Sequence, residues 1–418
     1  MKDPQLVRTR LEAEFGASAC STLERPGAAA VPRVDPPDEG ALAALIELAG
    51  SEDWAVLPIG GASTLGWTRS QARFDVAVGT SRLDALVAYE PGDGTITAGA
   101  GARIEVLAKR AAADGYALTP DVARPERSTL GGVIAAGRSG IDRERRGPVR
   151  HHVLGMRVAL ADGRFTKSGG RLVKNVTGYD MHRLHCGAFG TLGVIVEASL
   201  RLLPAPEERR LLCVEAHTPA RAFEVAARVR EQRLGTLTTL VEQSPEGART
   251  WVELAGSTER VDREERRLRE DLGDRSVERA DPGSSAALRD RLDPSSSIGE
   301  ALRLHVGVRP SRVTRLAADV TIAARELEVA LELASLTQVA TLEVEARAAP
   351  ATLAKFCDRA TALAAAAGGS SQLRARPLVL AGRLEPFGAP AGAALMRRLK
   401  WAFDPDDRFG RGKLRTEF

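Results

Sequence analysis

Helix-like and strand-like patterns of apolar residues alternate through the first half of the chain. Apolar residues recur at helical spacing in residues 40–50, and the apolar run 54–59 leads directly into a pair of glycines. The PGDG turn at 91–94 separates two strand-like runs, and residues 104–113 have the pattern of a helix that ends before Gly115. We therefore predict alternating helices and strands joined by glycine-rich loops.

The pattern changes around Leu203–Glu208, where a proline-containing stretch ends the glycine-dense half. Alanine-, leucine- and arginine-rich helices separated by short strands follow it. We expect helices at 221–231 and 260–272, a long helix across 323–336, and a strand at 341–348. This order is typical of a ferredoxin-like antiparallel sheet with helices on one face.

The charged run at 260–271 admits two interpretations, an interaction tail or a solvated helix. Val261, Leu268 and Leu272 fall on one helical face, which favours the helix.

Length and composition limit the class of protein. A chain of 418 residues exceeds what one hydrophobic core usually supports, and 44% apolar with 27% charged residues is typical of a globular protein. No run resembles a transmembrane segment or a secretory signal, so we expect a cytoplasmic protein. The net charge of +4 comes from basic residues interleaved with acids, which predicts no nucleic-acid partner. Four scattered cysteines without a CxxC pair suggest neither disulfides nor a zinc or iron–sulfur site.

Three glycine-rich segments carry the candidate chemistry. The first, PIGGAST, follows a strand and offers consecutive small residues whose backbone N–H groups can surround a pyrophosphate. It is neither a Walker loop nor a GxGxxG motif, and alone it fits a tight turn equally well. The second, STLGGVIAAGRSG, keeps small residues over a dozen positions, so a flat ligand can lie on the backbone. The third spans Gly169–Pro206. Three such segments in one half of a chain favour a ligand site.

These segments, with KNVTGYD, GTLGVI and the tail LMRRLKWAFDPDDRFGRGKL, resemble the FAD-binding domain of the vanillyl-alcohol-oxidase and p-cresol-methylhydroxylase (PCMH) type. Within that family they are most similar to the FAD-binding E subunit of bacterial glycolate oxidase. The match covers about Pro32–Pro206 and the last twenty residues. It implies an α+β protein in which a two-subdomain PCMH-type FAD-binding domain precedes a ferredoxin-like cap. The expected segments are a helical lead-in (1–31), the FAD-binding domain (32–206), the cap (207–397) and a tail returning to the FAD domain (398–418).

The resemblance also implies which residues hold FAD. Those expected to hold the pyrophosphate are Pro58, Gly60, Gly61, Ala62, Ser63 and Thr64. Those expected along the flavin and ribityl chain are Thr129, Gly131, Gly132, Ala135 and Gly140, and the backbone from Gly193 to Ile195 is expected on the adenine side. Some family members attach flavin through a histidine after the first glycines. Here Ala62 and Ser63 occupy that place, which predicts non-covalent FAD.

The chemistry of substrate oxidation is not visible in the cap. Oxidising a 2-hydroxy acid needs a base for the hydroxyl proton and a cation or metal for the carboxylate. Catalytic relatives carry an HxGDGNxH motif and a later Glu-His pair in the cap, and neither occurs here. We expect His217 and His305 of the cap to be surface or packed histidines. We therefore assign no catalytic residue and no metal ligand.

The missing motif favours one function over two others. The first is an FAD-binding subunit of a glycolate oxidase-type complex. It would oxidise a 2-hydroxy acid only together with two partners, a catalytic flavoprotein subunit of the D type and an iron–sulfur subunit of the F type. The complex would lie in the cytoplasm, or its partners would hold it at the inner face of the membrane. The alternative is a self-sufficient FAD-dependent dehydrogenase of D-lactate or glycolate. A third hypothesis, of another class, is a flavin-free scaffold subunit.

Several residues keep two interpretations. The pairs His151–His152 and His182–His185 could form a metal or proton-transfer site, but they lack a carboxylate-rich context. Lys174, Asn175 and Tyr179 fit helix capping and packing as well as flavin or partner contact. The tail has Gly410 and Gly412 where relatives usually have an Asn-Pro-Gly sequence, and His152 stands where they often have aspartate.

Overall fold

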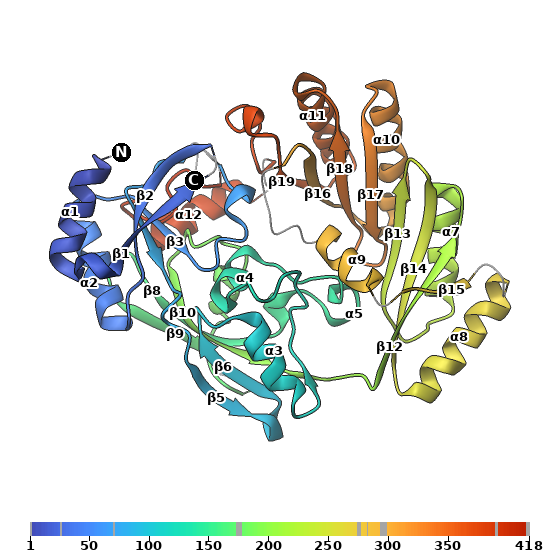
Figure 1. The fold of residues 1–418 in the computed structure, drawn as a ribbon, viewed down its shortest axis with the longest axis horizontal. Coiled ribbons are helices and arrows are strands. Elements are labelled where there is room, and N and C mark those ends of the chain that lie inside the picture. The colour runs from blue at the N-terminus through green and yellow to red at the C-terminus, as the bar shows by residue number, and fades with distance from the viewer. Residues whose placement is uncertain are drawn as a thin grey trace. The chain divides into compact units, whose positions relative to one another are not determined.

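A computed structural model describes residues 2–25, 27–69, 72–172, 178–273, 277–281, 283–292, 299–388 and 392–414 (Figure 1). Contacts between residues group the chain into two compact units. Unit 1 comprises residues 1–139, 148–205 and 391–418, and unit 2 comprises 140–147 and 206–390. The short segment 140–147 thus belongs with unit 2, although both of its neighbours in sequence belong with unit 1.

The first sheet of unit 1 has four strands in the order β1-β2-β4-β3, and β4 is parallel to both β2 and β3. These strands are β1 (Cys20–Arg25), β2 (Ala28–Val34), β3 (Val56–Ile59) and β4 (Val76–Gly79). Helix α1 (Pro4–Phe15) begins at an Asp3 cap, and α2 (Glu39–Ser51) at an Asp38 cap whose carboxylate accepts the Ala41 N–H. The apolar face of α2 is buried in the same core as β3 and β4.

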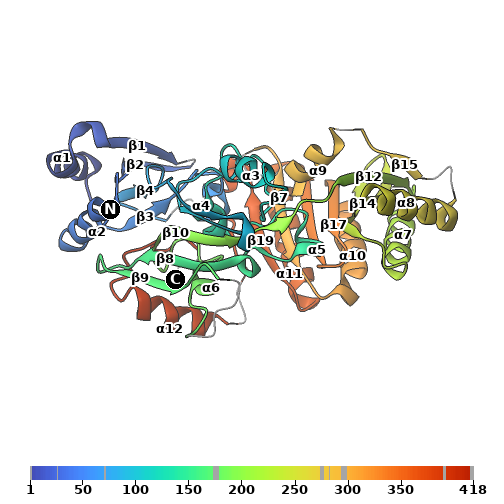
Figure 2. The same cartoon turned by 90° about the horizontal axis from the view of Figure 1, so that it is seen from below.

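The second sheet of unit 1 is antiparallel, with the order β5-β6-β10-β8-β9. Its strands are β5 (Leu86–Glu90), β6 (Thr95–Gly99), β8 (Val153–Ala159), β9 (Phe165–Gly169) and β10 (Val194–Arg201). Helices α3 (Ile104–Ala112) and α4 (Leu130–Ala136) pack on this sheet, and β7 (Tyr116–Ala117) pairs with β11 (Leu203–Pro204). Figure 2 shows α6 (His182–His185) and α12 (Ala393–Phe403) beneath β8 and β9.

The C-terminal tail is joined to the first sheet of unit 1. Phe409, fully buried, forms a parallel bridge with Val56 of β3. The Val56 N–H donates to the Arg408 carbonyl at 2.8 Å, and the Gly410 N–H donates to the Val56 carbonyl at 2.9 Å. Lys400 of α12 donates to the Thr191 carbonyl at 3.0 Å, which ties the tail to the third glycine-rich segment.

Unit 2 is built on one antiparallel sheet of eight strands in the order β15-β12-β14-β13-β17-β18-β16-β19. Each half has the chain order βαββαβ, and in each half the first and third strands lie in the centre. Two ferredoxin-like repeats are therefore joined through β13 and β17. The strands are β12 (Glu208–Glu215), β13 (Thr236–Ser244), β14 (Gly247–Gly256), β15 (Val277–Arg279), β16 (Leu302–Gly307), β17 (Ala330–Leu336), β18 (Thr341–Arg347) and β19 (Ser370–Ala375). The predicted α+β class and ferredoxin-like cap are confirmed; the duplication is new.

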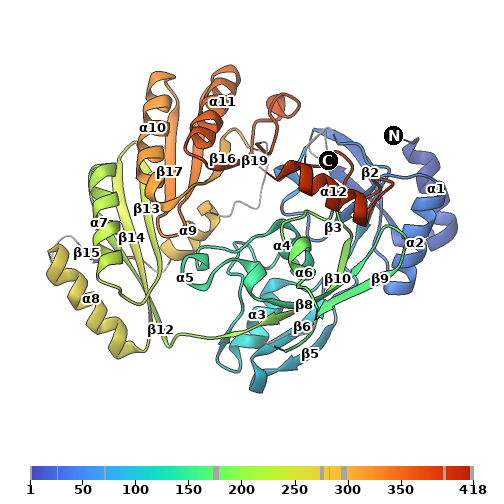
Figure 3. The ribbon, with the colours of Figure 1, turned by 180° about the vertical axis from the view of Figure 1, so that it is seen from behind.

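In the described part of unit 2, four helices cover one face of this sheet through alternate apolar strand residues. They are α7 (Pro219–Glu231), α8 (Thr258–Leu272), α10 (Val313–Glu326) and α11 (Pro350–Ala366). Helix α9 (Ser284–Leu292) packs on the opposite face, together with Ile141 of the segment 140–147. Figure 3 shows α7 and α9 on opposite sides of the strands.

The long helix predicted across 323–336 is wrong. Helix α10 ends at Glu326, Glu328 adopts a φ of 54°, and β17 begins at Ala330. Strand β17 lies in the middle of the sheet between β13 and β18, so its hydrogen bonds and the burial of both faces outweigh the helical propensity of its alanine, leucine and glutamate residues.

The segment 140–147, which contains α5 (Arg143–Arg146), is anchored in unit 2 by polar contacts. The Glu144 carboxylate accepts the N–H of Gln338 at 2.6 Å and that of Thr239. Burial raises the pKa of Glu144 to about 7, although these two hydrogen bonds oppose the shift. The hydroxyl of Thr238 donates to the Ile141 carbonyl at 3.1 Å.

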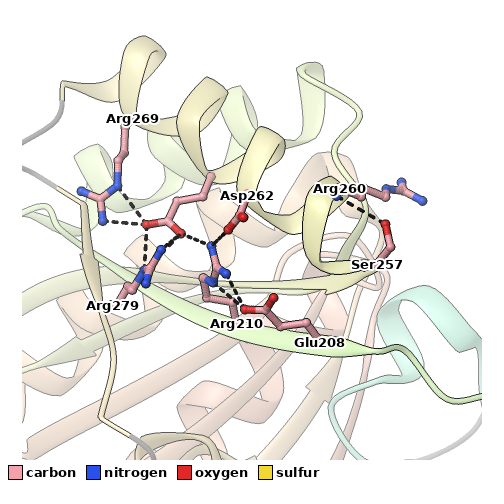
Figure 4. Close-up of polar contacts among 8 residues, drawn as sticks. Glu208, Arg210, Ser257, Arg260, Asp262, Arg269 and Arg279 are labelled. Carbon is pink, nitrogen blue, oxygen red and sulfur yellow. Dashed lines mark hydrogen bonds and ion pairs between the residues drawn. The ribbon is translucent and has the colours of Figure 1, made fainter.

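Helix α8 buries the predicted apolar residues Val261 and Leu268, and it also buries Glu265. Three guanidiniums surround the Glu265 carboxylate, those of Arg210 from β12, Arg269 from α8 and Arg279 from β15 (Figure 4). Burial alone would raise the pKa of Glu265, but the hydrogen bonds from these arginines lower it to about 2. This ionic cluster joins α8 to the edge of the sheet.

Replacing Glu265 with glutamine should destabilise unit 2 by about 2 kcal/mol at pH 7, because Arg269 and Arg279 lose this carboxylate partner. Arg210, the most buried of the three arginines, keeps Glu208 and Asp262, which limits the loss. The folded-state pKa lies below the ordinary 4.5, so the carboxylate's contribution is complete above pH 4.5 and is lost as pH falls toward 2. Urea unfolding of wild type and variant at several pH values should show the difference shrinking in that window. Glu259→Gln, on an exposed part of the same helix, is the matched control. An equal difference at pH 7 and pH 3 would contradict the prediction.

Candidate functional site

The three glycine-rich segments meet around one cleft in unit 1. Its walls come from the loop after β3, from α4, from the segment before β10 and from the C-terminal tail. The lining residues are Pro58, Ile59, Gly60, Gly61, Ala62, Ser63, Thr64, Leu65, Thr80, Gly131, Gly132, Ala135, Ala136, Phe189, Gly190, Gly193, Val194, Ile195 and Lys413. Segments far apart in the sequence therefore form one concave surface made largely of backbone and small side chains.

Glycine is required where the first loop meets the start of α4. A Cβ atom on Gly60 would lie 2.2 Å from Thr129 Oγ1, and one on Gly61 would lie 2.1 Å from the Arg127 carbonyl oxygen. Neither position has room for a side chain, so the two backbones lie directly against each other.

Thr129 holds this approach together. Its hydroxyl oxygen caps α4 by accepting the Gly132 N–H at 3.3 Å, and it also accepts the Gly61 N–H at 3.2 Å. Arg138, which is buried, donates to the Ser63 hydroxyl at 3.1 Å and to the Ser128 hydroxyl at 2.9 Å. The first loop is thus held in position by the side chains of Thr129 and Arg138.

Most of the residues assigned to FAD from the sequence line this cleft. They are Pro58, Gly60, Gly61, Ala62, Ser63, Thr64, Gly131, Gly132, Ala135, Gly193 and Ile195. Thr129 and Gly140 are not among the lining residues: the side chain of Thr129 is engaged as described above, and Gly140 belongs to the segment that lies with unit 2. Contact of each residue with the cofactor stays a prediction.

Lys413 also lines the cleft, although it was not among the residues assigned to FAD from the sequence. Its side chain is buried, and Nζ donates to the Phe189 carbonyl at 2.8 Å. Burial lowers the pKa of Lys413 to about 7, and the charge of Arg25 lowers it further. The available signal was its place in the GRGKL tail, next to the unusual glycines.

Two glycines of the C-terminal tail, Gly410 and Gly412, adopt backbone conformations that favour glycine. Gly410 and Gly412 both have a φ of 63°, in the left-handed region. A Cβ on Gly410 would also lie 2.8 Å from Thr191 Cγ2. The departure from the usual Asn-Pro-Gly sequence is therefore compatible with a docked tail that places Lys413 in the cleft.

The histidine pairs of unit 1 are packed side chains or surface groups. His185 is buried, its ring lies edge-on to Phe403 with centroids 5.6 Å apart, and burial lowers its pKa to about 4. Burial also lowers the pKa of His182. His152 is fully buried and His151 is exposed. Within the described ranges, no group of three or more His, Cys, Asp or Glu side chains could hold a metal ion.

In unit 2, His217 is exposed, whereas His305 of β16 is paired. His305 Nδ1 contacts the carboxylate of Glu343 directly across on β18, and Arg374 of β19 donates to the same carboxylate at 3.1 Å. Burial lowers the pKa of His305, the charge of Arg374 adds to this, and Glu343 opposes it. His305 is therefore a packed histidine whose ring is oriented by a carboxylate.

Lys174, Asn175 and Tyr179 are the residues for which both packing and flavin or partner contact were considered. Lys174 and Asn175 lie outside the described residues. Tyr179 is 88% exposed, which gives no support to a packing role. Across the described ranges, none of the helices combines the length and the apolar character that crossing a bilayer requires.

Comparisons with known proteins agree with this geometry. A family model described as "FAD binding domain" matches residues 32–169. The chain is 33% identical over 163 residues to the D-2-hydroxyglutarate dehydrogenase of Xanthomonas citri pv. viticola, covering 39% of this chain and 34% of that protein. It is 37% identical over 122 residues to the glycolate oxidase subunit GlcE of Escherichia coli K12, covering 29% of this chain and 35% of that protein. The alignments thus span about a third of these curated relatives.

A solved structure of alkyldihydroxyacetonephosphate synthase shares the fold, with a TM-score of 0.71 over 97% of this chain and 84% of that chain. Their sequence identity is only 16%, so this likeness concerns the fold alone. The family match, by contrast, covers the first loop and α4, whose glycines wall the cleft. Residues 32–169, a third of this chain, are therefore similar to the family described as an FAD binding domain.

Proposed function

We propose that this chain is the FAD-carrying subunit of a complex that oxidises a 2-hydroxy acid and passes the electrons to an iron–sulfur partner. The observation that carries the proposal is the cleft in unit 1, where three glycine-rich segments and a buried lysine surround a concave surface of bare backbone. The names of the relatives support the substrate class. Besides those given above, they include a glycolate oxidase subunit GlcD of Bacillus subtilis and a D-lactate dehydrogenase of Archaeoglobus fulgidus.

The residues of the cleft fit FAD in shape and in chemistry. In the loop Pro58–Thr64, the backbone N–H groups of Gly60, Ala62, Ser63 and Thr64, with the hydroxyls of Ser63 and Thr64, would hold the pyrophosphate, and Lys413 would supply positive charge. Gly131, Gly132 and Ala135 would lie along the flavin and ribityl chain, with Gly193–Ile195 on the adenine side. Bound FAD supplies a hydride acceptor. Ala62 and Ser63 offer no histidine or cysteine for a covalent link, so FAD would be held non-covalently.

A separate catalytic subunit would account for the lack of a metal site in the described part of unit 2. The described part of unit 2 contains no cluster of metal ligands of the kind a 2-hydroxy-acid site would use for a carboxylate. The proposal therefore assigns the substrate's base and metal to a D-type flavoprotein subunit and onward electron transfer to an F-type iron–sulfur subunit. Such a complex would work in the cytoplasm or, through its partners, at the inner face of the membrane.

A second candidate is a dehydrogenase that is active without partners, and one observation favours it. His305 faces Glu343 through Nδ1, which fixes the ring and leaves Nε2 to accept a proton from a substrate hydroxyl. Arg374 beside the same carboxylate would add positive charge for an anionic substrate. This arrangement is what a base in unit 2 would require. The third hypothesis, a flavin-free scaffold, has no such observation in its favour.

The purified chain should be yellow, with an oxidised flavin spectrum, because its cleft holds FAD without a partner. Anaerobic addition of glycolate, D-lactate or D-2-hydroxyglutarate should leave the spectrum oxidised. Addition of the D-type and F-type subunits should then give substrate-dependent bleaching. Rapid bleaching of the lone chain would refute the subunit proposal, and a colourless protein that binds no added FAD would favour the scaffold.

Gly61→Ala should weaken FAD binding by about 10- to 100-fold, because the new methyl would displace the loop from the Arg127 carbonyl, 2.1 Å away. Gly61→Asp should remove FAD altogether, because the larger side chain displaces the loop further and adds a negative charge to the loop proposed to hold the pyrophosphate. Flavin content and fluorescence titration of the apoprotein measure both effects. Gly92→Ala is the control, since that position is exposed and a methyl group added there would have no atom within 4 Å. Full flavin content in Gly61→Asp would refute the loop assignment.

His305→Asn separates the two candidate functions. If the lone chain oxidises a 2-hydroxy acid, loss of the base should lower kcat by about 100-fold or more, with unchanged FAD content. Glu343→Gln should lower it less, since that residue only orients the ring. If the chain is a partner-dependent subunit, neither change should alter turnover of the assembled complex. Full lone-chain activity in His305→Asn would exclude this histidine as the base.

A further inference from the structure

Lys413 is a buried lysine for which the described residues supply no acidic partner. Among the residues that the structure describes, no carboxylate forms an ion pair with it, and its Nζ is bound to a neutral acceptor, the Phe189 carbonyl. Lys400 on the same tail is also buried, but it is paired with Asp404 and Asp407. Two buried lysines of one tail thus meet opposite electrostatic conditions.

The surroundings of Lys413 add positive rather than negative charge. Arg25 of β1 lowers the pKa of Lys413, in addition to the larger effect of burial. Arg69, after the first loop, donates its side chain to the Gly412 carbonyl at 3.4 Å and its backbone N–H to the Lys413 carbonyl at 2.8 Å. On the tail itself, Asp404 and Asp407 are engaged by Lys400. The cleft is therefore short of negative charge where Lys413 lines it.

We propose that Lys413 is the counter-ion of the FAD pyrophosphate, so that FAD binding takes up a proton at this side chain and fastens the C-terminal tail to unit 1. The proposal rests on the FAD site proposed above. The pyrophosphate is the one strongly anionic part of FAD. It would enter a cleft lined by a lysine that has no acidic partner among the described residues. Its charge favours the protonated lysine, which reverses the effect of burial.

The sign of the pH dependence follows from this linkage. In the apoprotein the pKa of Lys413 is lowered to about 7, so the side chain is largely neutral at pH 8. The bound pyrophosphate raises that pKa, so binding at pH 8 consumes close to one proton. FAD affinity should fall by up to about tenfold per pH unit above pH 7, until the pKa of the complex is reached.

The same contact would secure the tail. The Lys413 N–H donates to the Gly410 carbonyl at 2.8 Å, its carbonyl accepts the Arg69 N–H, and its Nζ reaches Phe189 in the third glycine-rich segment. A ligand that holds the ammonium group therefore holds the tail between the first loop and the third segment. Hydrogen exchange of residues 404–414 should slow when FAD binds, and slow less in Lys413→Met.

The test is titration of the apoprotein with FAD by calorimetry at pH 8, in HEPES and in Tris buffer. The two buffers differ in ionisation enthalpy, so the difference in apparent enthalpy gives the proton uptake. Wild type should take up close to one proton per FAD. Lys413→Met should take up none and bind more weakly at pH 7, and Lys413→Arg should bind well with no proton uptake, because arginine stays charged. Arg411→Met, which removes a charge of the same tail outside the cleft lining, should behave as wild type.

Unfolding of the apoprotein shows whether Lys413→Met is correctly folded. The folded-state pKa of Lys413 lies below the ordinary 10.5, so wild-type stability should rise as pH increases from about 7 toward 10.5. Lys413→Met should lack this rise and be at least as stable as wild type at pH 7. Equal proton uptake by wild type and Lys413→Met, or no uptake by a wild type that binds FAD, would overturn the inference alone. Failure of wild type to bind FAD would instead overturn the proposed function.

Discussion

The close approach of the first glycine loop to the start of α4 is the constraint on which the candidate site depends. Gly60 and Gly61 face Thr129 and the Arg127 carbonyl with no room for a Cβ atom. The Thr129 hydroxyl, which accepts N–H groups from both backbones, fixes their spacing. Because Gly60, Gly61, Gly131 and Gly132 carry no side chains, peptide groups form this part of the cleft wall. An anionic dinucleotide can lie along such a wall, next to the N–H groups of Ala62, Ser63 and Thr64 in the adjoining loop.

Much of this site could be predicted from the sequence, because its chemistry is that of glycine and small residues in contiguous motifs. The residues that hold the loop in place could not. Arg138 supports Ser63 only after the chain has folded back on itself, and Lys413 reaches the cleft from the opposite end of the chain. Neither contact leaves a periodic or local signal. A lysine in a basic, glycine-containing tail is typical of a solvated surface, and only its burial distinguishes it.

The fold of unit 2 could likewise be predicted only in part from the sequence. Alternation of helices and strands predicted the ferredoxin-like class, but local propensity failed in 323–336. There a sequence rich in alanine, leucine and glutamate forms a central strand, because neighbours on both edges supply its hydrogen bonds. The tandem repeat, and the contact of Glu144 with the same sheet, also depend on residues that are far apart in the sequence. Glu144 is separated from Thr239 and Gln338 by long stretches of sequence, and only the folded chain brings their N–H groups to its carboxylate.

The buried charged side chains differ in whether the protein itself supplies opposite charges around them. This difference separates groups that stabilise the fold from a group that we propose binds a ligand. Glu265 has three guanidiniums around it, and Lys400 has two carboxylates and two backbone carbonyls. Each of these groups has its charge balanced within the protein, as a structural role requires. Within the described part of the chain, the Nζ of Lys413 donates to one neutral acceptor, the Phe189 carbonyl, and Lys413 lines a cleft. A charge that the fold does not balance costs stability in the apoprotein, and an anion bound in the cleft would remove that cost. The imbalance thus couples occupancy of the cleft to the order of the tail, and the tail's bridge to β3 extends that coupling to the sheet that carries the first loop.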